Sequence, residues 1–273
     1  MGEFIFQSCD LTDIDTRNHI LSIRWEHDSA DARSFRPDGF SFAVTGDGCD
    51  AVCRGSFRFD QGVSLRENVT AFLSEGLFDN VFAEADIMVP TEKASLAPAE
   101  IRTEDSAVAL LHLNGIVVSP EETVRCTDCG NGRVLILAVN REVAELFEEK
   151  FGTGEGNRLR YSHPLSVLAS EGMGAVEPRE GDEAVIRVYR SAGMLVLTLH
   201  DKEGGLCYAD LLPDMDCPSL LFLVNRLVVN HKVGKVHILC GGDDAGSMVR
   251  TLGHYYRRTG TMDREAFRHS ACM

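Results

Sequence analysis

The two halves of the chain are predicted to contain strands and helices in the same order, and this repetition constrains the fold more than any single motif. Alternation of apolar and polar residues predicts strands, and apolar residues spaced by three or four predict helices. In the first half these patterns predict three strands, a helix, a strand and a helix, followed by two more strands and another helix. The predicted elements are 21–25, 40–44, 51–59, 64–76, 81–89, 98–111, 123–127, 133–139 and 140–152.

The second half repeats that order with clearer boundaries. Its first three strands follow one another closely, and Ser191–Gly193 and Asp201–Gly205 are suitable hairpin connections. Pro218 begins a helix that is apolar almost all round and is therefore expected to be covered on most sides. The side chain of Asp243 or Asp244 is expected to cap a final helix. The predicted elements are 184–190, 194–200, 206–210, 218–229, 235–240 and 244–256.

This order of elements predicts the fold class. A three-stranded meander followed by alternating helices and strands gives a mixed sheet with helices on its faces, so the class is α/β with mixed sheets. Two copies of the unit correspond to the ribonuclease-H-like duplication of the actin-like ATPase superfold, a step that rests on fold analogy. The stretch 171–183 is rich in Gly and acidic residues and is expected to be a linker. The predicted ribonuclease-H-like domains are 1–175 and 176–273.

Several segments along the chain share their pattern with one protein family. They are 88–90, 96–101, 110–114, 134–139, 160–165, 186–210, 220–229 and 237–242. In combination these segments resemble an uncharacterised bacterial family, a domain of unknown function with the actin-like ATPase fold. The resemblance covers most of the chain, from about Leu21 to Tyr256, and implies the duplicated fold. It implies no catalytic residues, because the family carries no assigned activity.

Charge and composition exclude several kinds of partner. The chain has 27 Lys and Arg residues against 42 Asp and Glu residues, which gives a formal net charge of −15. A surface this acidic repels nucleic-acid phosphates and anionic lipids, so neither nucleic acid nor a membrane is expected as a partner. No apolar run approaches the roughly 18 residues of a membrane span, and the first residues do not resemble a secretory signal. The cysteines are scattered and odd in number, which favours a reducing, cytoplasmic setting.

The turns that hold metal and phosphate in active members of the superfold differ in this chain. In those members a Gly-rich first turn carries an Asp near the metal and phosphates, and a second such turn opens the other domain. Here the turn between Glu26 and Gly39 is long and lacks a compact Asp-x-Gly-Thr arrangement, and the turn from Arg190 to Gly193 has no carboxylate. Mg²⁺ would lack its usual carboxylate ligand, and the γ-phosphate charge would be poorly compensated. Nucleotide hydrolysis in the usual manner is therefore not expected.

Gly241, Gly242 and Asp243 are the candidate nucleotide-binding residues. They retain the strand–Gly-Gly–helix outline that touches the adenosine in active members of the superfold. Glycine allows the backbone to approach a ligand, and a helix N-terminus offers free N–H groups. However, Asp243 and Asp244 would repel phosphate and would serve equally well as helix caps, so a purely structural turn is the alternative.

Cys126 and Cys129 have the spacing of half a zinc site or of a redox pair. Cys49 and Cys53 could supply a second half, although their spacing at the start of a strand is poor geometry for a metal. Unpaired thiols at a turn are the other interpretation. We therefore assign no metal ligand, and we assign no catalytic residue anywhere in the chain.

These observations predict a non-catalytic, degenerate actin-like protein that acts by binding a protein partner or a small ligand. The alternative is an enzyme of the actin-like superfamily that binds or hydrolyses ATP and takes its Mg²⁺ ligands from Asp28, Asp31 or Asp38.

Overall fold

A computed structural model describes most of the chain. The described residues are 2–9, 16–26, 37–46, 51–101, 103–130, 132–152, 158–170, 184–191 and 193–262. The predicted boundary between residues 175 and 176 lies outside them and stays a prediction.

Sheet A forms the core of the first half of the chain. Its spatial order is β1-β4-β3-β2-β5-β9. The strands β2, β5 and β9 are parallel to one another, whereas β3 and β4 form an antiparallel meander with β2. The strands are β1 (Glu3–Cys9), β2 (Ile20–Glu26), β3 (Gly39–Thr45), β4 (Ala51–Arg58), β5 (Glu84–Met88) and β9 (Arg158–Ser162).

Sheet C in the second half has the same plan. Its order is β12-β11-β10-β13-β14, which matches β4-β3-β2-β5-β9 strand for strand and in strand direction. The predicted fold class, with a duplicated strand order in mixed sheets, is confirmed. The strands are β10 (Ala184–Ser191), β11 (Met194–His200), β12 (Leu206–Pro213), β13 (Val236–Gly242) and β14 (Arg258–Thr261).

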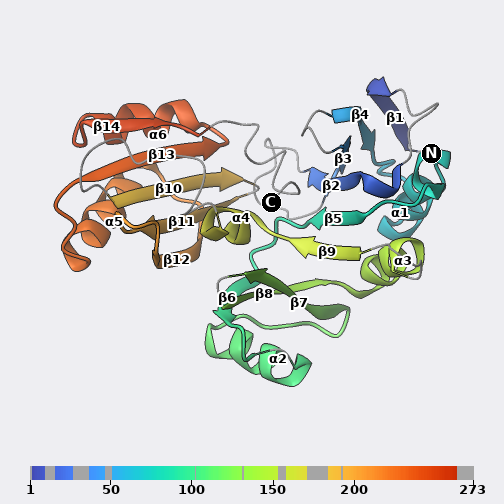
Figure 1. Cartoon of the computed structure of the whole chain (residues 1–273), viewed down its shortest axis with the longest axis horizontal. Helices are drawn as coiled ribbons and strands as arrows, with labels where there is room; N and C mark the ends of the chain where they lie inside the picture. The colour runs from blue at the N-terminus through green and yellow to red at the C-terminus, as the bar shows by residue number, and fades with distance from the viewer. Residues whose placement is uncertain are drawn as a thin grey trace.

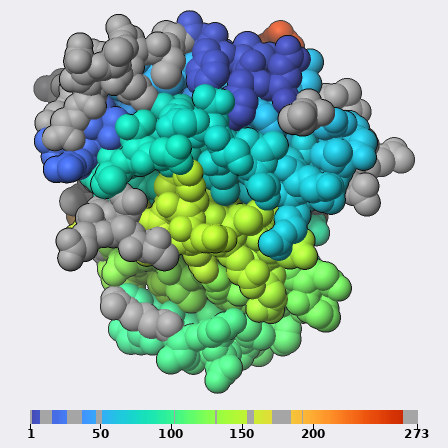
Figure 2. Space-filling model, turned by 90° about the vertical axis from the view of Figure 1, so that its right-hand side faces the viewer, coloured from blue at the N-terminus to red at the C-terminus, as the bar shows by residue number. Residues whose placement is uncertain are grey.

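Helices cover one face of each sheet. In the first half α1 (Leu65–Leu73) and α3 (Arg141–Phe151) contact each other against sheet A, and Figure 2 shows the side of the molecule where they lie. In the second half α5 (Cys217–Asn230) and α6 (Ala245–Gly253) cover sheet C in the same way. The short 3-10 helices Thr16–Asn18 and Gly76–Asp79 complete the connections around sheet A.

A three-stranded sheet, sheet B, interrupts the repeat in the first half. It has the order β6-β8-β7 and carries α2 (Glu104–Leu113) on one face. Because this unit stands between β5 and α3, the helix that matches α6 is α3 and not the predicted helix at 98–111. The strands are β6 (Ala94–Pro98), β7 (Glu122–Gly130) and β8 (Arg133–Asn140).

The start of the predicted helix at Pro98 is wrong. Pro98 ends β6, where it pairs with Arg133 of β8, and α2 begins only after Thr103, whose hydroxyl accepts from the Ser106 N–H. A proline is as suitable at the end of an edge strand as at the start of a helix, so the residue alone could not distinguish the two. The strands β1, β6, β9 and β14 and the helix α4 (Pro164–Ser170) were not predicted.

The helix α4 connects the two sheets. It follows β9 of sheet A and packs on the face of sheet C that α5 and α6 leave open, against β11 and β12 (Figure 1). The buried His163 begins it: its Nδ1 accepts from the Leu165 N–H at 2.9 Å, and its Nε2 lies 2.9 Å from the Thr91 carbonyl. Burial lowers the pKa of His163 to about 4, so the ring is neutral at physiological pH. A neutral ring can accept and donate in this way at the same time.

The expectation that α5 is covered on most sides is wrong. Leu220, Val224 and Leu227 are buried, but Phe222 and Val229 are 68% and 72% exposed. One apolar stripe is enough to seat a helix on a sheet, so the remaining apolar residues of α5 stay at the surface.

Aromatic side chains form the centre of the sheet A core. Phe72 of α1 is fully buried, with its ring centroid 4.5 Å from that of Phe78 and 4.6 Å from that of Phe40. The N-terminus of α1 is fixed by a capping box in which Ser64 and Glu67 exchange hydrogen bonds, as predicted. The cap positions the helix so that Phe72 meets the rings of sheet A.

Phe72→Ala is expected to lower the free energy of unfolding by about 3–5 kcal/mol, because it removes a buried ring and leaves a cavity. Phe222→Ala removes the same group from an exposed site and is expected to change stability by less than about 1 kcal/mol. Urea unfolding followed by circular dichroism measures both. Equal losses for the two variants would contradict the position of the core.

Candidate functional site

The carboxyl ends of the parallel strands of sheets A and C point toward each other (Figure 1). Ligands of open α/β sheets commonly bind beyond such strand ends. Here a side-chain contact joins the two sheets: Arg24 near the end of β2 donates from Nη2 to the Tyr189 hydroxyl of β10 at 2.9 Å. We call this region the junction.

Charge at the junction centres on the Arg24 guanidinium. Burial acts to lower the pKa of Arg24, but the pKa is raised overall by Tyr189, Glu26 and Asp243. The candidate residue Asp243 therefore belongs to the electrostatic environment of Arg24. A carboxylate in this position stabilises the cation, and it would repel a phosphate placed beside it.

Gly241 and Gly242 are required by packing of the chain on itself. Gly242 has φ +77°, and a Cβ there would lie 1.9 Å from the Arg190 carbonyl oxygen. At Gly241 a Cβ would lie 2.7 Å from Met262 Cε and 3.2 Å from Tyr189 Cδ2. The close approach that glycine permits is thus already used by strand β10 and by Met262.

Arg190 fills the space beside this turn. Its Nε lies 2.8 Å from Asp214 Oδ1, its Nη1 lies 3.7 Å from Asp244 Oδ2, and its Nη2 donates to the Met215 carbonyl at 2.6 Å. The expected side-chain cap of α6 is wrong: Asp244 is the N-cap residue but makes no capping hydrogen bond, because it adopts a left-handed conformation with φ 53°. Its carboxylate faces Arg190 instead.

The structure thus brings the predicted residues Gly241, Gly242 and Asp243 together at the junction, beside Arg24 and Arg190. Their contacts are with residues of the same chain. A role in nucleotide binding stays a prediction.

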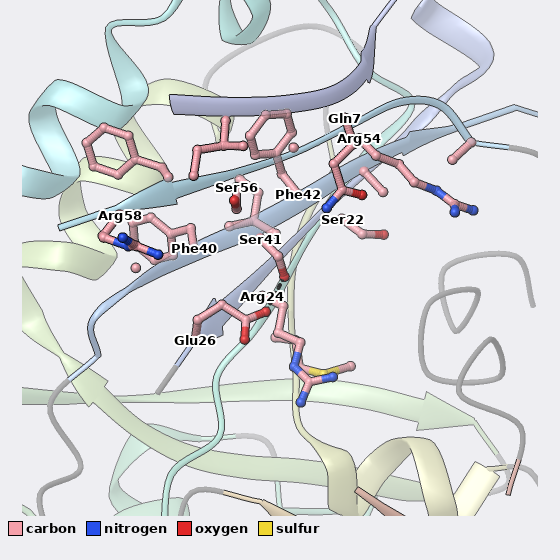
Figure 3. A pocket seen from close by; sticks show the side chains of 18 of the residues that line it. Gln7, Ser22, Arg24, Glu26, Phe40, Ser41, Phe42, Arg54, Ser56 and Arg58 are labelled. Carbon is pink, nitrogen blue, oxygen red and sulfur yellow. Dashed lines mark hydrogen bonds between the residues drawn. The ribbon is translucent and has the colours of Figure 1, made fainter. Parts of the chain in front are cut away.

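A second region, the polar face of sheet A, was not predicted as a site. On this face lies a hollow of about 500 Å³ (Figure 3). Small side chains form its floor, and longer polar and charged side chains surround it. The floor includes Ser22, Ser41, Ala43 and Ser56, and the longer side chains include Gln7, Arg24, Glu26, Asp38, Arg54, Arg58 and Asp86.

The charged side chains of the hollow differ in their hydrogen bonds and ion pairs. Glu26 accepts a hydrogen bond from the Ser41 hydroxyl at 2.5 Å, and Arg24 is bound to Tyr189. The side chains of Arg54 and Arg58, both on β4, make no ion pair or hydrogen bond with any residue that the structure describes.

Asp86 is the buried charge of the hollow. It is 3% exposed, and its Oδ1 has no hydrogen-bond partner within the described ranges. Burial raises the pKa of Asp86 to about 6, although Ser162 and Arg160 act to lower it. This carboxyl group consequently changes its charge near physiological pH.

The cysteines considered as halves of a zinc site differ in their state. Cys126 and Cys129 are free thiols on β7, and burial raises the pKa of Cys129 to about 11. Cys53 is disulfide-bonded, so it cannot supply a thiolate to a second half of a zinc site, and Cys49 lies outside the described residues. Within the described ranges no cluster of three or more His, Cys, Asp or Glu could hold a metal ion.

A reducing, cytoplasmic setting was predicted from the scattered cysteines. None of the helices in the described part of the chain is both long and apolar enough to cross a membrane. A cytoplasmic location stays a prediction.

The sequence contained a signal for the hollow that the prediction did not use. The strand alternation that places Phe57 in the core places Arg54, Ser56 and Arg58 on the opposite face. The contact between Arg24 and Tyr189, which are 165 residues apart, had no comparable signal because it depends on how the two sheets meet.

Gly242→Ala is expected to destabilise the protein by at least about 1 kcal/mol, because the added Cβ collides with the Arg190 carbonyl at a positive φ. Gly246→Ala, in the exposed first turn of α6 with open space around it, is the control and is expected to be neutral or stabilising by about 0.5–1 kcal/mol. Thermal denaturation of the two variants measures the difference. An unchanged midpoint for Gly242→Ala would show that the turn is not packed in this way.

Asp86→Asn is expected to stabilise the protein at pH 7–8 by about 1–3 kcal/mol. The pKa of Asp86 is about 6 in the folded chain against 3.8 for an ordinary Asp, so the folded state binds more protons between these pH values. The contribution of Asp86 to stability is therefore fully present below pH 3.8 and is lost as the pH rises through 6. Urea unfolding of wild type, Asp86→Asn and the exposed control Asp105→Asn from pH 4 to 8 checks this. Parallel profiles for wild type and Asp86→Asn would contradict it.

The comparisons with known proteins identify a fold. No protein-family model matches the chain, and no curated protein matches it. The chain is similar to a Bacteroides thetaiotaomicron VPI-5482 protein with an actin-like ATPase fold and unknown function. The identity is 16%, the match covers 94% of this chain and 97% of that chain, and the TM-score is 0.73.

The chain is also similar to a structure of the PilM–PilN type IV pilus biogenesis complex. The identity is 12%, the match covers 93% of this chain and 90% of that chain, and the TM-score is 0.52. Identities this low show the fold alone, so the chain has the actin-like ATPase fold that the sequence predicted.

Proposed function

We propose that the protein acts by binding a small ligand or a partner protein and does not hydrolyse nucleotide. The observation that carries this proposal is the contrast between the two regions of the structure. The junction is occupied by the chain's own contacts among Arg24, Tyr189 and Asp243, whereas the polar face of sheet A offers a hollow with uncommitted charges.

The chemistry of the junction supports the non-catalytic part of the proposal. The strand–Gly-Gly–helix turn brings the carboxylates of Asp243 and Asp244 to Arg24 and Arg190. A phosphate there would displace these ion-pair partners and would meet two like charges. The connection from Ser191 to Met194 supplies no carboxylate that could hold Mg²⁺.

The neighbouring structures support binding only by analogy of fold. The PilM–PilN structure is a complex of two proteins, which is consistent with a protein partner for this chain. The division into domains 1–175 and 176–273, a bacterial origin and a cytoplasmic location belong to the same proposal.

The alternative is a nucleotide-dependent enzyme that takes its metal ligands from Asp28, Asp31 or Asp38. One observation favours it: Asp38 and Glu26 both line the hollow, and the Asp38 N–H donates to the Glu26 carbonyl at 3.0 Å, which brings the two residues together. Asp28 and Asp31 lie outside the described residues.

Thermal denaturation with and without ATP, ADP and Mg²⁺ separates these functions. Specific binding at about 100 times Kd would raise the free energy of unfolding by roughly 2.7 kcal/mol. We expect no shift in the midpoint and no Mg²⁺-dependent phosphate release, because Asp243 and Asp244 already pair with the positive charge at the junction and would repel the phosphates. Turnover that is lost in Asp38→Asn or Asp28→Ala but kept in Asp105→Asn would make the protein an enzyme and contradict the proposal.

A further inference from the structure

Strand β4 presents Arg54, Ser56 and Arg58 on the polar face of sheet A. Side chains alternate along a strand, so Gly55 and Phe57 belong to the opposite side, where Phe57 is buried in the aromatic core. Figure 3 shows Arg54 and Arg58 on either side of Ser56 at the hollow. The sequence Arg-x-Ser-x-Arg thus becomes three polar side chains in a row.

The two arginines differ from others whose charge is satisfied within the chain. Arg125 pairs with Glu148 at 2.6 Å, and Arg190 lies 2.8 Å from Asp214. Arg54 and Arg58 have no such partner among the described residues, although the chain carries a net charge of −15. Carboxylates are abundant in this protein, so two uncommitted guanidinium groups beside one hollow point to an external anion.

We propose that Arg54, Ser56 and Arg58 bind an anionic group of a small molecule in the hollow, an inference that rests on the proposed function. Residues two apart on a strand are separated by roughly 7 Å, which is about the reach of an arginine side chain. Both guanidinium groups can therefore turn inward over Ser56, whose hydroxyl donates to the same group. We call these three residues the anion clamp.

The planar guanidinium fork selects carboxylate or phosphate, because either presents two oxygens to its parallel N–H groups. The hollow of about 500 Å³ has the size of a small-molecule site.

Nearby acids define the rest of the ligand. Glu26 lies across Gly39 from Arg58 in the sheet, and Glu3 lies directly opposite Arg58 on β1. Gly39 has no side chain, so nothing on β3 separates Arg58 from the Glu26 carboxylate at this level. A molecule with several negative charges would be repelled by these acids. The ligand therefore carries one anionic group at Ser56 and a hydroxyl or amine that donates to Glu26.

The test is a calorimetric titration of the full chain with inorganic phosphate and, separately, with glycerol phosphate and glycerate at matched ionic strength. We expect saturable binding of at least one of the two organic probes, weakened about 10-fold or more by Arg54→Gln and by Arg58→Gln, since each removes a charge-assisted hydrogen bond. Arg66→Gln, an exposed arginine on α1 against the other face of sheet A, is the matched control and should bind like wild type. A preference for glycerol phosphate identifies the anion as phosphate, and a preference for glycerate identifies it as carboxylate.

Two results would overturn the anion clamp. One is the absence of saturable binding of all three probes to the wild-type protein. The other is equal affinity in Arg54→Gln, Arg58→Gln and Arg66→Gln.

Ala43→Trp keeps the clamp test separate from the proposed function, because it places a large ring on the floor of the hollow and leaves Arg54 and Arg58 unchanged. Loss of binding in Ala43→Trp together with full binding in both arginine variants rejects the clamp and leaves binding in the hollow intact. Full binding of the probes by Ala43→Trp would show that they do not bind in the hollow. If the wild-type protein also turns over nucleotide with Mg²⁺, both the clamp and the proposed function are rejected. Circular dichroism and the thermal midpoint of each variant confirm that it folds.

Discussion

The alternation of side chains along β2, β3 and β4 is the constraint on which the rest of the structure depends. It turns Leu21, Ile23, Phe40, Phe42 and Phe57 toward α1 and α3, where each buried side chain contributes about 1.5–3 kcal/mol. The same alternation turns the serines and arginines of these strands toward the polar face. A shift of one residue in register would exchange the two faces, so the buried aromatic core also fixes the positions of the polar groups.

The two sheets of the fold are held together by polar contacts as well as by packing. Arg24 reaches Tyr189 across the junction, and α4 extends from sheet A to the open face of sheet C, where the His200 Nε2 lies 3.0 Å from the Leu168 carbonyl. The contact between Arg24 and Tyr189 lies at the strand ends where an α/β fold usually binds its ligand. The hollow on sheet A is a separate surface, on the polar face, and our proposed binding function uses it.

The sequence predicted the parts of the fold that depend on local patterns. The capping box at Ser64 and Glu67, the cap of α3 at Asn140 and the meander of sheet C follow from spacing within a few residues, and all are confirmed. The sheet B unit was not recognised, because Pro98 fits the end of a strand and the start of a helix equally well. The left-handed turn at Asp244 was not predicted either, and its carboxylate faces Arg190, which is far away in the sequence.

In the candidate site, too, the features that depend on neighbouring residues were predicted, and those that depend on distant residues were not. Gly241, Gly242 and Asp243 were predicted to lie at a strand–helix turn, and they do, but the groups that occupy their surroundings come from β10 and from Met262. The strand pattern could have revealed that Arg54, Ser56 and Arg58 share one face. That both arginine side chains lack a partner among the described residues depends on the arrangement of the whole sheet and could not be predicted from the pattern.

The proposed binding function depends on an open polar face of sheet A, on which the side chains of Arg54 and Arg58 have no partner among the described residues. Modification of the native protein with an arginine-specific dicarbonyl reagent, followed by mass spectrometry of the time course, tests it most directly. The account predicts that Arg54 and Arg58 react well before Arg190, which is 9% exposed and bound to Asp214 and the Met215 carbonyl. Protection of Arg54 and Arg58 to the level of Arg190 in the native protein, lost on unfolding, would contradict the claim.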